Sequence, residues 1–460
     1  GRLADWLRPR AVLAVLFLLA SGACMSVPLL NDRVNDKIEW SPKSNEASWL
    51  VSTVNSFSGG KIPEKEEEKL LVPWSGRVFA HVLLVFLLPS TILGTIGPVV
   101  AKMALERSKR IGRTVGNVYA WGALGSIVGT FVTGFYLTSK LGTEAVVWSV
   151  GGALGVMGLL FCLSLLWSAS RPSEALIPFF AVFWALGIPV LVFLAGLNHW
   201  GVFKGGEWPW QWVERDGRWV LRERPAAGRD IVYLDESDYS FIKVELLTEE
   251  DEDGGEGEPK KEVRRELVLD NLIHAYYVPG KIEKLEYDYE GIYKAVTHRY
   301  APPEAREREG LKALFIGGGG YIYPRYLRSV WPECYIEIAE IDPAVTRAVL
   351  AEFGLEKDSV QIVNSLADRS RKDNPIWIHH LDARNHIEDL VRRKDAGEPV
   401  PEFDFIYGDA FNDYTVPFHL TTEEFNQKVK RLLKPGTGVY MINIIDIFNP
   451  GSFLGAIYNT

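Results

Sequence analysis

Residues 311–343 read LKALFIGGGGYIYPRYLRSVWPECYIEIAEIDP. This pattern predicts a buried strand over Ala313–Ile316, a glycine turn over Gly317–Gly320, a helix to about Val330 and a second buried strand over Tyr335–Ile341. Glycines let the backbone turn sharply and approach a ligand, and the helix that follows offers unpaired N–H groups at its start. The stretch therefore predicts the first half of a nucleotide-binding βαβ unit.

The acid at the tip of the second strand, Glu340 or Asp342, lies where such folds bind the two ribose hydroxyls. The dinucleotide fingerprint G-x-G-x-x-G is absent, and four glycines alone are also typical of a plain turn between a strand and a helix. The whole string, from the first hydrophobic strand to E-I-D-P, favours nucleoside binding over a structural turn.

Acids also follow two later strands of the same half. Asp382 follows the strand predicted at 377–380, and Asp409 follows the strand predicted at 403–407. One acid at a strand end is often only a helix N-cap, but three such acids behind a glycine turn indicate a ligand-binding rim. Further helices are predicted at Ala344–Phe353, Ala383–Lys394 and about Thr422–Leu433, and a last strand at Gly438–Ile444.

A small antiparallel sheet is predicted before this unit. Its strands are expected at Ile231–Leu234, Tyr239–Leu247 and Arg265–Asp270. The acidic, glycine-rich run EEDEDGGEGEPKKE (249–262) between them is interpreted as a disordered hairpin tip. The segment 198–222 is rich in Trp, which is typical of an aromatic belt where a chain leaves a bilayer.

The first 200 residues contain five apolar segments, each long enough to span a bilayer, which needs roughly 20 residues. They lie at about 11–30, 78–100, 118–138, 145–167 and 176–197. A secretory signal is the rival interpretation of the first segment, but the four segments that follow favour a membrane helix. The fifth segment contains Pro178 and Pro189, and we expect it to be broken or re-entrant.

Small residues in the third and fourth segments predict close helix packing. Gly122 and Ser126, and likewise Gly125 and Gly129, have the small-xxx-small spacing that lets membrane helices approach. No ionisable residue lies in the interior of segments two to five, and His81 lies near an end. A transport function is therefore disfavoured.

The positive-inside rule places the loop 101–117 in the cytoplasm. With five spans, everything after residue 197 would then lie outside, whereas a nucleoside ligand would be cytosolic. Two interpretations stay open: one segment does not span, or the soluble half is extracytoplasmic and not catalytic in the usual way. The basic residues of the loop are Lys102, Arg107, Lys109, Arg110 and Arg113.

Composition sets further bounds. The 460 residues carry a formal net charge of -9 at pH 7, and the pI is about 5.6, which gives no support for nucleic-acid binding. Cys24, Cys162 and Cys334 form no Cys/His cluster, so neither a disulfide framework nor a metal site is predicted. The chain starts at Gly1 and stops just after a strand-like run, and we expect it to be a fragment of a longer protein.

Several segments resemble the polyamine aminopropyltransferases, the family of spermidine synthase and its relatives. The resemblance lies in FIGGGGYIYPRYL, IEIAEIDPAVTRAVLAEFGL, HHLDARNHI and FDFIYGDAFNDYTVPFHLTTEEF. LDESDYSFIKV and LVLDNLIHAYY are similar to the family's N-terminal sheet. LPSTILGTIGPVVAK and GRTVGNVYAWGALGSIVGTFVTGFYL are similar to its membrane-fused branch. The resemblance covers about residues 78–450.

The resemblance implies a nucleoside site. The family binds decarboxylated S-adenosylmethionine and transfers its aminopropyl group to the amine of putrescine. Gly317, Gly318 and Gly319 would form the turn against the cofactor. Glu340 would hold the ribose hydroxyls, and Asp382 would contact the adenine amino group.

It also implies that Asp409 accepts a proton from the attacking amine or orients it. A carboxylate is needed there because a protonated amine cannot attack. The family's second acid, three residues later, is Asn412 here, and Asp413, one residue further on, is a supporting candidate. The chain departs from the family pattern at Gly320, where the family has an acid. It departs again at Lys294, where the family has Gln after a tyrosine, here Tyr293.

The sequence thus predicts a multi-span helical membrane domain (1–200), a Trp-rich linker with a small β-sheet domain (201–300) and an α/β Rossmann-like domain of the S-adenosylmethionine-dependent transferase type (301–460). The first functional hypothesis is a membrane-anchored aminopropyl or other transferase. It would use S-adenosylmethionine or its decarboxylated form, with methylthioadenosine as a further ligand. The second is an inactive accessory or scaffold subunit of a membrane complex that keeps the transferase fold.

Both hypotheses predict an integral protein of an inner or plasma membrane. The expected partners are the lipid bilayer, subunits of a membrane complex and a polyamine substrate. No covalently bound cofactor and no nucleic-acid partner are expected.

Overall fold

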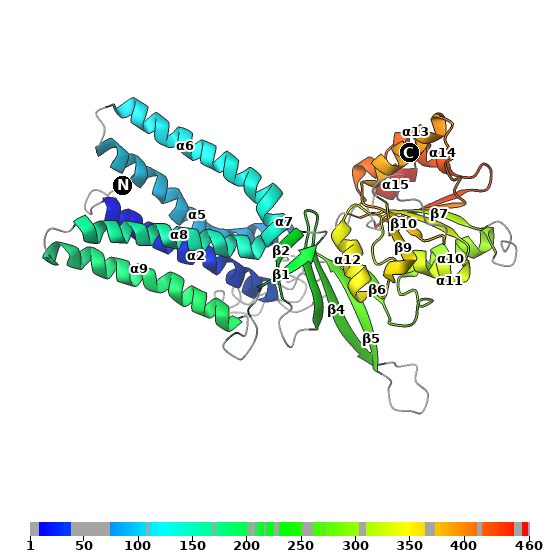
Figure 1. Cartoon of the computed structure of the whole chain (residues 1–460), viewed down its shortest axis with the longest axis horizontal. Helices are drawn as coiled ribbons and strands as arrows, with labels where there is room; N and C mark the ends of the chain where they lie inside the picture. The colour runs from blue at the N-terminus through cyan, green and yellow to red at the C-terminus, as the bar shows by residue number, and fades with distance from the viewer. Residues whose placement is uncertain are drawn as a thin grey trace, which may run out of the picture. The chain divides into compact units, whose positions relative to one another are not determined.

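The computed structural model divides the chain into two compact units, residues 1–221 and 222–460 (Figure 1). The first is helical, and the second combines an antiparallel sheet with an α/β domain, which confirms the predicted fold class. The residues that the structure describes are 9–37, 74–106, 110–168, 172–199, 202, 208, 210–215, 218–224, 230–250, 261–270, 272–302, 310–363, 373–411, 416–445 and 453–458.

Long apolar helices build the first unit. They are α2 (Pro9–Lys37), α5 (Trp74–Glu106), α6 (Ile111–Val132), α8 (Thr143–Ser168) and α9 (Pro172–His199); a π-helix (Thr133–Leu137) and the short α7 (Thr138–Leu141) follow α6. Among the described residues, four helical stretches are long and apolar enough to cross a membrane: Pro9–Asn31, Phe79–Glu106, Ile111–Leu141 and Thr143–Leu165.

The fifth apolar segment is a single helix. α9 runs without interruption from Pro172 to His199, so the expected break at Pro178 and Pro189 is wrong. Its apolar stretch counted over described side chains, Ala185–His199, is shorter than a span.

Glycines of α8 allow α2 to lie directly against it. A Cβ at Gly151 would lie 2.6 Å from Met25 Cγ, and one at Gly158 would lie 2.8 Å from Leu18 Cδ2. The Ser21 hydroxyl donates a hydrogen bond of 2.7 Å to the Gly151 carbonyl across this contact. The packing predicted for the fourth segment is therefore made.

The packing predicted for the third segment is not made among the described residues. Cβ atoms built at Gly122, Gly125 and Gly129 of α6 would meet nothing within 4 Å. None of the α6 side chains is buried. The small residues of α6 therefore leave this face open toward whatever surrounds the helix.

The second unit begins with a four-stranded antiparallel sheet in the order β3-β4-β5-β6. Its strands are β3 (Ile231–Glu236), β4 (Phe241–Glu250), β5 (Lys261–Leu269) and β6 (Leu272–Tyr277). Three of these strands were predicted. The Trp-rich segment also forms strands, β1 (Trp210–Arg215) and β2 (Arg218–Glu223), which pair as a two-stranded sheet that the sequence did not predict.

A six-stranded, all-parallel sheet forms the centre of the second unit. Its order is β12-β11-β7-β8-β10-β9. The strands are β7 (Lys312–Ile316), β8 (Tyr335–Ala339), β9 (Val360–Ile362), β10 (Ile376–His379), β11 (Phe405–Gly408) and β12 (Val439–Ile442). All but the short β9 were predicted to within a few residues.

Helices cover both faces of this sheet, as alternation along its buried strands requires. α10 (Asp288–Tyr300), α11 (Ile322–Val330) and α12 (Pro343–Glu352) pack on the face that Phe315 and Ile338 share. α13 (Ala383–Asp395) and α14 (Glu423–Leu432) pack on the face that Leu314 and Ile316 share (Figure 1). A short helix, α15 (Phe453–Tyr458), comes last.

The α2–α8 contact yields a first prediction. We expect Gly158→Leu to destabilise the helical unit by about 1–3 kcal/mol, because the new side chain would overlap Leu18 in a packed contact. The matched control is Gly152→Leu in the same helix, where a Cβ would meet nothing within 4 Å. Thermal unfolding of the detergent-solubilised chain would measure both, and equal stability of the two variants would contradict the expectation.

Candidate active site

The order of the parallel sheet reverses between β7 and β11. From β7 the chain moves outward to β8 and β10, whereas β11 and β12 lie on the other side of β7. Such a reversal opens a crevice at the carboxyl ends of the strands, where ligands bind in open α/β sheets. Gly317 follows β7 and Asp409 follows β11, so the fold brings two predicted site elements to this point.

The glycine turn needs its glycines. Gly317 has φ +94° and Gly319 has φ +48°, which L-residues with side chains rarely adopt. A Cβ at Gly317 would lie 2.5 Å from the Asp409 carbonyl oxygen, and one at Gly318 would lie 2.8 Å from the ring of Tyr321. The turn is therefore pressed between the end of β11 and the buried Tyr321 ring.

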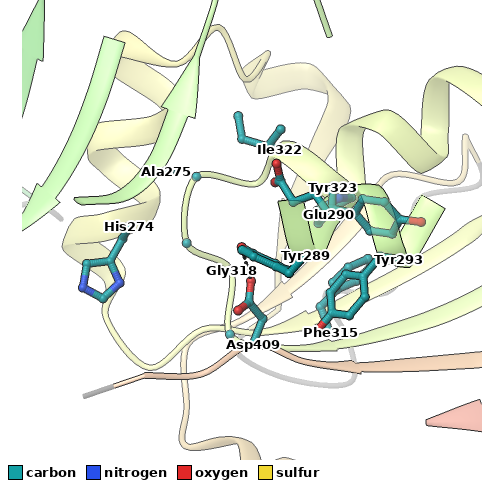
Figure 2. Close-up of a pocket in the computed structure, with 14 residues that line it drawn as sticks. His274, Ala275, Tyr289, Glu290, Tyr293, Phe315, Gly318, Ile322, Tyr323 and Asp409 are labelled. Atoms are coloured by element: carbon teal, nitrogen blue, oxygen red, sulfur yellow. Dashed lines mark hydrogen bonds between the residues drawn. The ribbon is translucent and has the colours of Figure 1, made fainter. Parts of the chain in front are cut away.

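A cavity of about 30 Å³ lies beside the turn (Figure 2). Its walls come from β6, α10, the end of β7, the glycine turn, the start of α11 and Asp409. This volume holds about one water molecule, so a nucleoside or diamine needs the walls to move apart. The polar side chains that line it include those of Asp409, Glu290, Tyr289 and His274.

Asp409 is held by two donors. The Tyr289 hydroxyl donates to Oδ2 at 2.9 Å, and the Asn443 amide donates to Oδ1 at 2.9 Å. Burial raises the pKa of Asp409 above its usual value, although these two hydrogen bonds act in the opposite direction. A carboxylate with a raised pKa is a better proton acceptor, as general-base catalysis requires.

Glu290 is a second carboxyl in the cavity wall. Burial raises its pKa to about 7, and the backbone N–H of Tyr287, which donates to Oε2 at 3.3 Å, offsets part of this effect. Its pKa puts its charge change near neutral pH. Tyr289 and Glu290 both come from the first turn of α10.

Tyrosines line the wall behind these acids. The Tyr293 hydroxyl donates to the Gly408 carbonyl at 3.3 Å, and its ring lies edge-on to Tyr289 and Tyr323. The Thr297 hydroxyl bonds the hydroxyls of Tyr323 (2.9 Å) and Tyr407 (2.8 Å). Aromatic faces beside carboxyl groups suit an organic cation better than an anion.

Glu340 supports the turn from behind. Its Oε2 accepts from the Gly318 N–H at 2.8 Å, and Oε1 accepts from the Asp342 N–H at 2.9 Å. Burial raises its pKa to about 7. Each carboxylate oxygen has a second lone pair, so Glu340 can still accept from ribose hydroxyls. It does not line the cavity itself.

The other strand-end acids cap helices. Asp342 Oδ1 accepts from the Ala344 N–H at 2.8 Å, and Asp382 Oδ1 accepts from the Arg384 N–H at 2.9 Å. The Asp382 Oδ2 lies 2.8 Å from His419 Nε2. Neither acid lines the cavity. The N-cap interpretation is therefore correct for both, and the predicted adenine contact of Asp382 stays a prediction.

Two departures from the family pattern have structural explanations. A Cβ at Gly320 would lie 2.3 Å from the Cβ of Ala275 in β6, so no acid fits there. The Lys294 ammonium lies 5.3 Å from the centre of the Tyr326 ring, and Lys294 is exposed and does not line the cavity. It would therefore not repel a cation bound beside Asp409. Asp413 lies outside the described residues.

Sequence reasoning missed α10 and with it Tyr289 and Glu290. Residues 229–300 were interpreted as strands only, yet DYEGIY contains signals of a helix start. Acids occupy the first turn, and Tyr289 and Tyr293 have the i, i+4 spacing of one helix face. Asn443 was also missed, and a single Asn after a strand carries no comparable signal.

The contact between Gly320 and Ala275 yields a second prediction. We expect Gly320→Ala to destabilise the second unit by about 1–3 kcal/mol through overlap with Ala275. The double variant Gly320→Ala/Ala275→Gly should recover part of that loss, since the overlapping atom is removed. Thermal unfolding of the single and double variants measures this coupling, and strictly additive losses would show that the two positions are not in contact.

No protein-family model matches. A polyamine aminopropyltransferase from Vibrio vulnificus (strain CMCP6) is 33% identical over 132 residues, which are 29% of this chain and 37% of that protein. The chain thus spans little more than a third of this relative.

Solved structures with a similar arrangement include a probable spermidine synthase from Corynebacterium glutamicum ATCC 13032. It is 22% identical, with 48% of this chain and 64% of that chain covered, at a TM-score of 0.33. A spermidine synthase in complex with the transition-state analogue AdoDATO is 19% identical, with 55% and 68% covered, at a TM-score of 0.31. Over the 132 residues matched to the Vibrio protein, the sequence of this chain is therefore similar to that of a polyamine aminopropyltransferase.

Proposed function

We propose that the chain is a membrane-anchored transferase that moves an alkyl group, such as aminopropyl, from an S-adenosylmethionine-type donor to an amine. The donor would be S-adenosylmethionine or its decarboxylated form, and the amine a polyamine. The observation that carries this proposal is the position of Asp409. It follows β11 at the reversal point of the sheet, next to the glycine turn, in a wall of tyrosines.

The chemistry requires a carboxylate at that position. An amine is protonated at neutral pH and has no free lone pair for attack. Asp409 would hold the ammonium group and take its proton. The amine nitrogen then bonds to the carbon beside the sulfonium, the carbon–sulfur bond breaks, and its electron pair stays on sulfur. The products are the alkylated amine and a neutral thioether nucleoside.

Nucleoside binding would fall to the turn and Glu340. The ribose hydroxyls would donate to the free lone pairs of Glu340, while Gly317–Gly319 let the backbone approach the ligand. Most of the rate enhancement would come from binding the two substrates side by side, because a sulfonium leaving group needs orientation more than acid catalysis. The apolar helices of the first unit would anchor the protein in a membrane.

The second candidate function is an accessory subunit of a membrane complex. One observation favours it. Ala275 occupies the space that a side chain at position 320 would need, so this chain has no carboxyl at the place where the family resemblance predicts one. In this case the second unit would keep the fold and bind other subunits without turnover.

A third prediction tests the proposed activity with the full chain in detergent. We expect release of methylthioadenosine from decarboxylated S-adenosylmethionine in the presence of putrescine or spermidine. Asp409→Asn should lower kcat by about 10²–10⁴ because the proton acceptor is lost. Its affinity for methylthioadenosine, measured by calorimetry, should stay within about twofold, since the nucleoside contacts remain.

The matched control is Asp395→Asn, an exposed acid of α13 that pairs with Arg431. It should leave both turnover and binding unchanged. If methylthioadenosine binds but no polyamine is turned over, the result would contradict the transferase function and favour the accessory function. An absence of binding at millimolar ligand would contradict the nucleoside site itself.

A fourth prediction follows from the pKa of Glu340, which burial raises to about 7. The ionised carboxylate accepts from both ribose hydroxyls, so methylthioadenosine should bind about tenfold more tightly at pH 8 than at pH 6, in proportion to the ionised fraction. Glu340→Gln should weaken binding and flatten this profile. Calorimetry at both pH values measures it, and an unchanged slope in the variant would assign the titration to another group, such as Glu290.

The stability of the folded chain should change with pH in the opposite direction to ligand binding. In the unfolded chain a Glu ionises near pH 4.3, whereas folded Glu340 keeps its proton to about 7. Its contribution to stability is therefore present at low pH and lost as the pH rises through 7. Ligand binding and folding thus respond to the same proton in opposite directions.

A further inference from the structure

Three buried side chains converge in the layer between the parallel sheet and α13. They are Glu337 of β8, His379 of β10 and His386 of α13. Glu337 Oε1 lies 2.9 Å from His379 Nε2 and 3.0 Å from His386 Nε2. One donor atom from each residue lies within 4.8 Å of the other two. None of the three lines the cavity beside the glycine turn.

The fold places these residues together. Along β8, Ile336 and Ile338 face the core under α12, so Glu337 faces the opposite side, where α13 packs. In the parallel register Glu337 pairs with Trp377, and His379 follows two residues later on the same face. His386 comes one turn into α13, and its ring centre lies 4.2 Å from that of His379.

Burying these three ionisable side chains together costs free energy unless each has a hydrogen-bond partner or a metal ion. Glu337 is fully buried, and His379 and His386 are 6% and 4% exposed. A buried carboxylate or imidazole needs a partner of opposite character. Yet, among the described residues, His386 Nε2 makes no hydrogen bond of acceptable geometry, although Glu337 Oε1 is only 3.0 Å away. The nitrogen points into the cluster without a proper acceptor.

The spacing suits a metal ion. In a tetrahedral site with bonds of about 2.0–2.1 Å to nitrogen and oxygen, the ligand atoms lie about 3.3 Å apart. The present separations of 2.9 and 3.0 Å need an expansion of only a few tenths of an ångström. The Tyr335 hydroxyl donates to Glu337 Oε2 at 2.6 Å, the kind of hydrogen bond that orients ligating carboxylates.

We propose that Glu337, His379 and His386 bind one divalent transition-metal ion of the Zn²⁺ type. Two imidazole nitrogens and one carboxylate oxygen form a donor set that zinc accepts, and that Ca²⁺ and Mg²⁺, which prefer oxygen, do not. Three protein ligands leave a fourth position, which a water molecule would fill. The ion would cross-link two strands and a helix from different places in the sequence.

The ion would also fix part of the candidate active site. His386 lies one turn after Asp382, and its N–H donates to the Asp382 carbonyl at 3.0 Å. Holding His386 therefore holds the first turn of α13, where Asp382 is the N-cap. The proposal does not depend on the transferase function, because it rests on residues outside the cavity.

The experiment uses the full chain, purified in detergent without a histidine tag and stripped with a chelator. We titrate it with Co²⁺, whose visible d–d bands are intense in four-coordinate sites, and then compete with Zn²⁺. We expect one equivalent of Co²⁺ to bind, Zn²⁺ to displace it, and Zn²⁺ to raise the thermal unfolding temperature. A wild-type chain that gives no such bands at one equivalent would overturn the proposal.

His386→Asn and Glu337→Gln should each weaken binding by at least about 100-fold, because a ligand is lost. The matched control is His380→Asn, which removes the neighbouring histidine that bonds Thr346 outside the cluster, and should leave the titration unchanged. Unaltered bands in His386→Asn would overturn the proposal. If that variant does not fold, X-ray absorption of the zinc-loaded wild type decides. Two imidazoles and no sulfur support the site, and any other shell contradicts it.

Discussion

The backbone N–H of Asp409 donates a 2.9 Å hydrogen bond to the carbonyl of Ile316, and this bond joins β11 to β7 where the strand order of the sheet reverses. β7 and β11 end side by side, and the segments that follow them must leave the sheet in different directions. Position 317 can then hold only glycine, because a Cβ would lie 2.5 Å from the Asp409 carbonyl. The turn, the carboxyl of Asp409 and the tyrosines that reach it all depend on this close approach.

Hydrophobic patterning predicted the parallel sheet and its helices because their buried faces are aliphatic and aromatic, with regular period. The same method failed for α10, whose buried positions are Glu290, Tyr293 and Thr297. Three polar or hydroxyl-bearing residues do not register as a core face in sequence. Tyr293 and Thr297 find hydrogen-bond partners on β11, whereas Glu290 accepts from the N–H of Tyr287 at the start of its own helix. The spacing of these residues is that of one helix face, but a search for hydrophobic residues alone does not detect it.

The sequence predicted the candidate site as acids that follow successive strands. These acids, Glu340, Asp382 and Asp409, do follow β8, β10 and β11 at one edge of the sheet. What each acid contacts could not be read from the chain, because a ligand acid and an N-cap need the same residue at the same place. Ser237, which bonds Asp342, is 105 residues away, and His419, beside Asp382, is 37 away. Likewise, only the packing of Ala275 explains why position 320 is glycine.

The hydroxyl of Tyr289 already donates a hydrogen bond to the Asp409 carboxylate. In the proposed reaction, an amine would either use a free lone pair of this carboxylate or exchange with the hydroxyl that is already bonded to it. Exchange of one hydrogen bond for another is nearly neutral in free energy, whereas displacement by a group without a donor leaves the acid unsatisfied at a cost of about 1–3 kcal/mol. Under the proposed function, Tyr289 would therefore favour ligands that can donate a hydrogen bond to Asp409 over ligands that cannot.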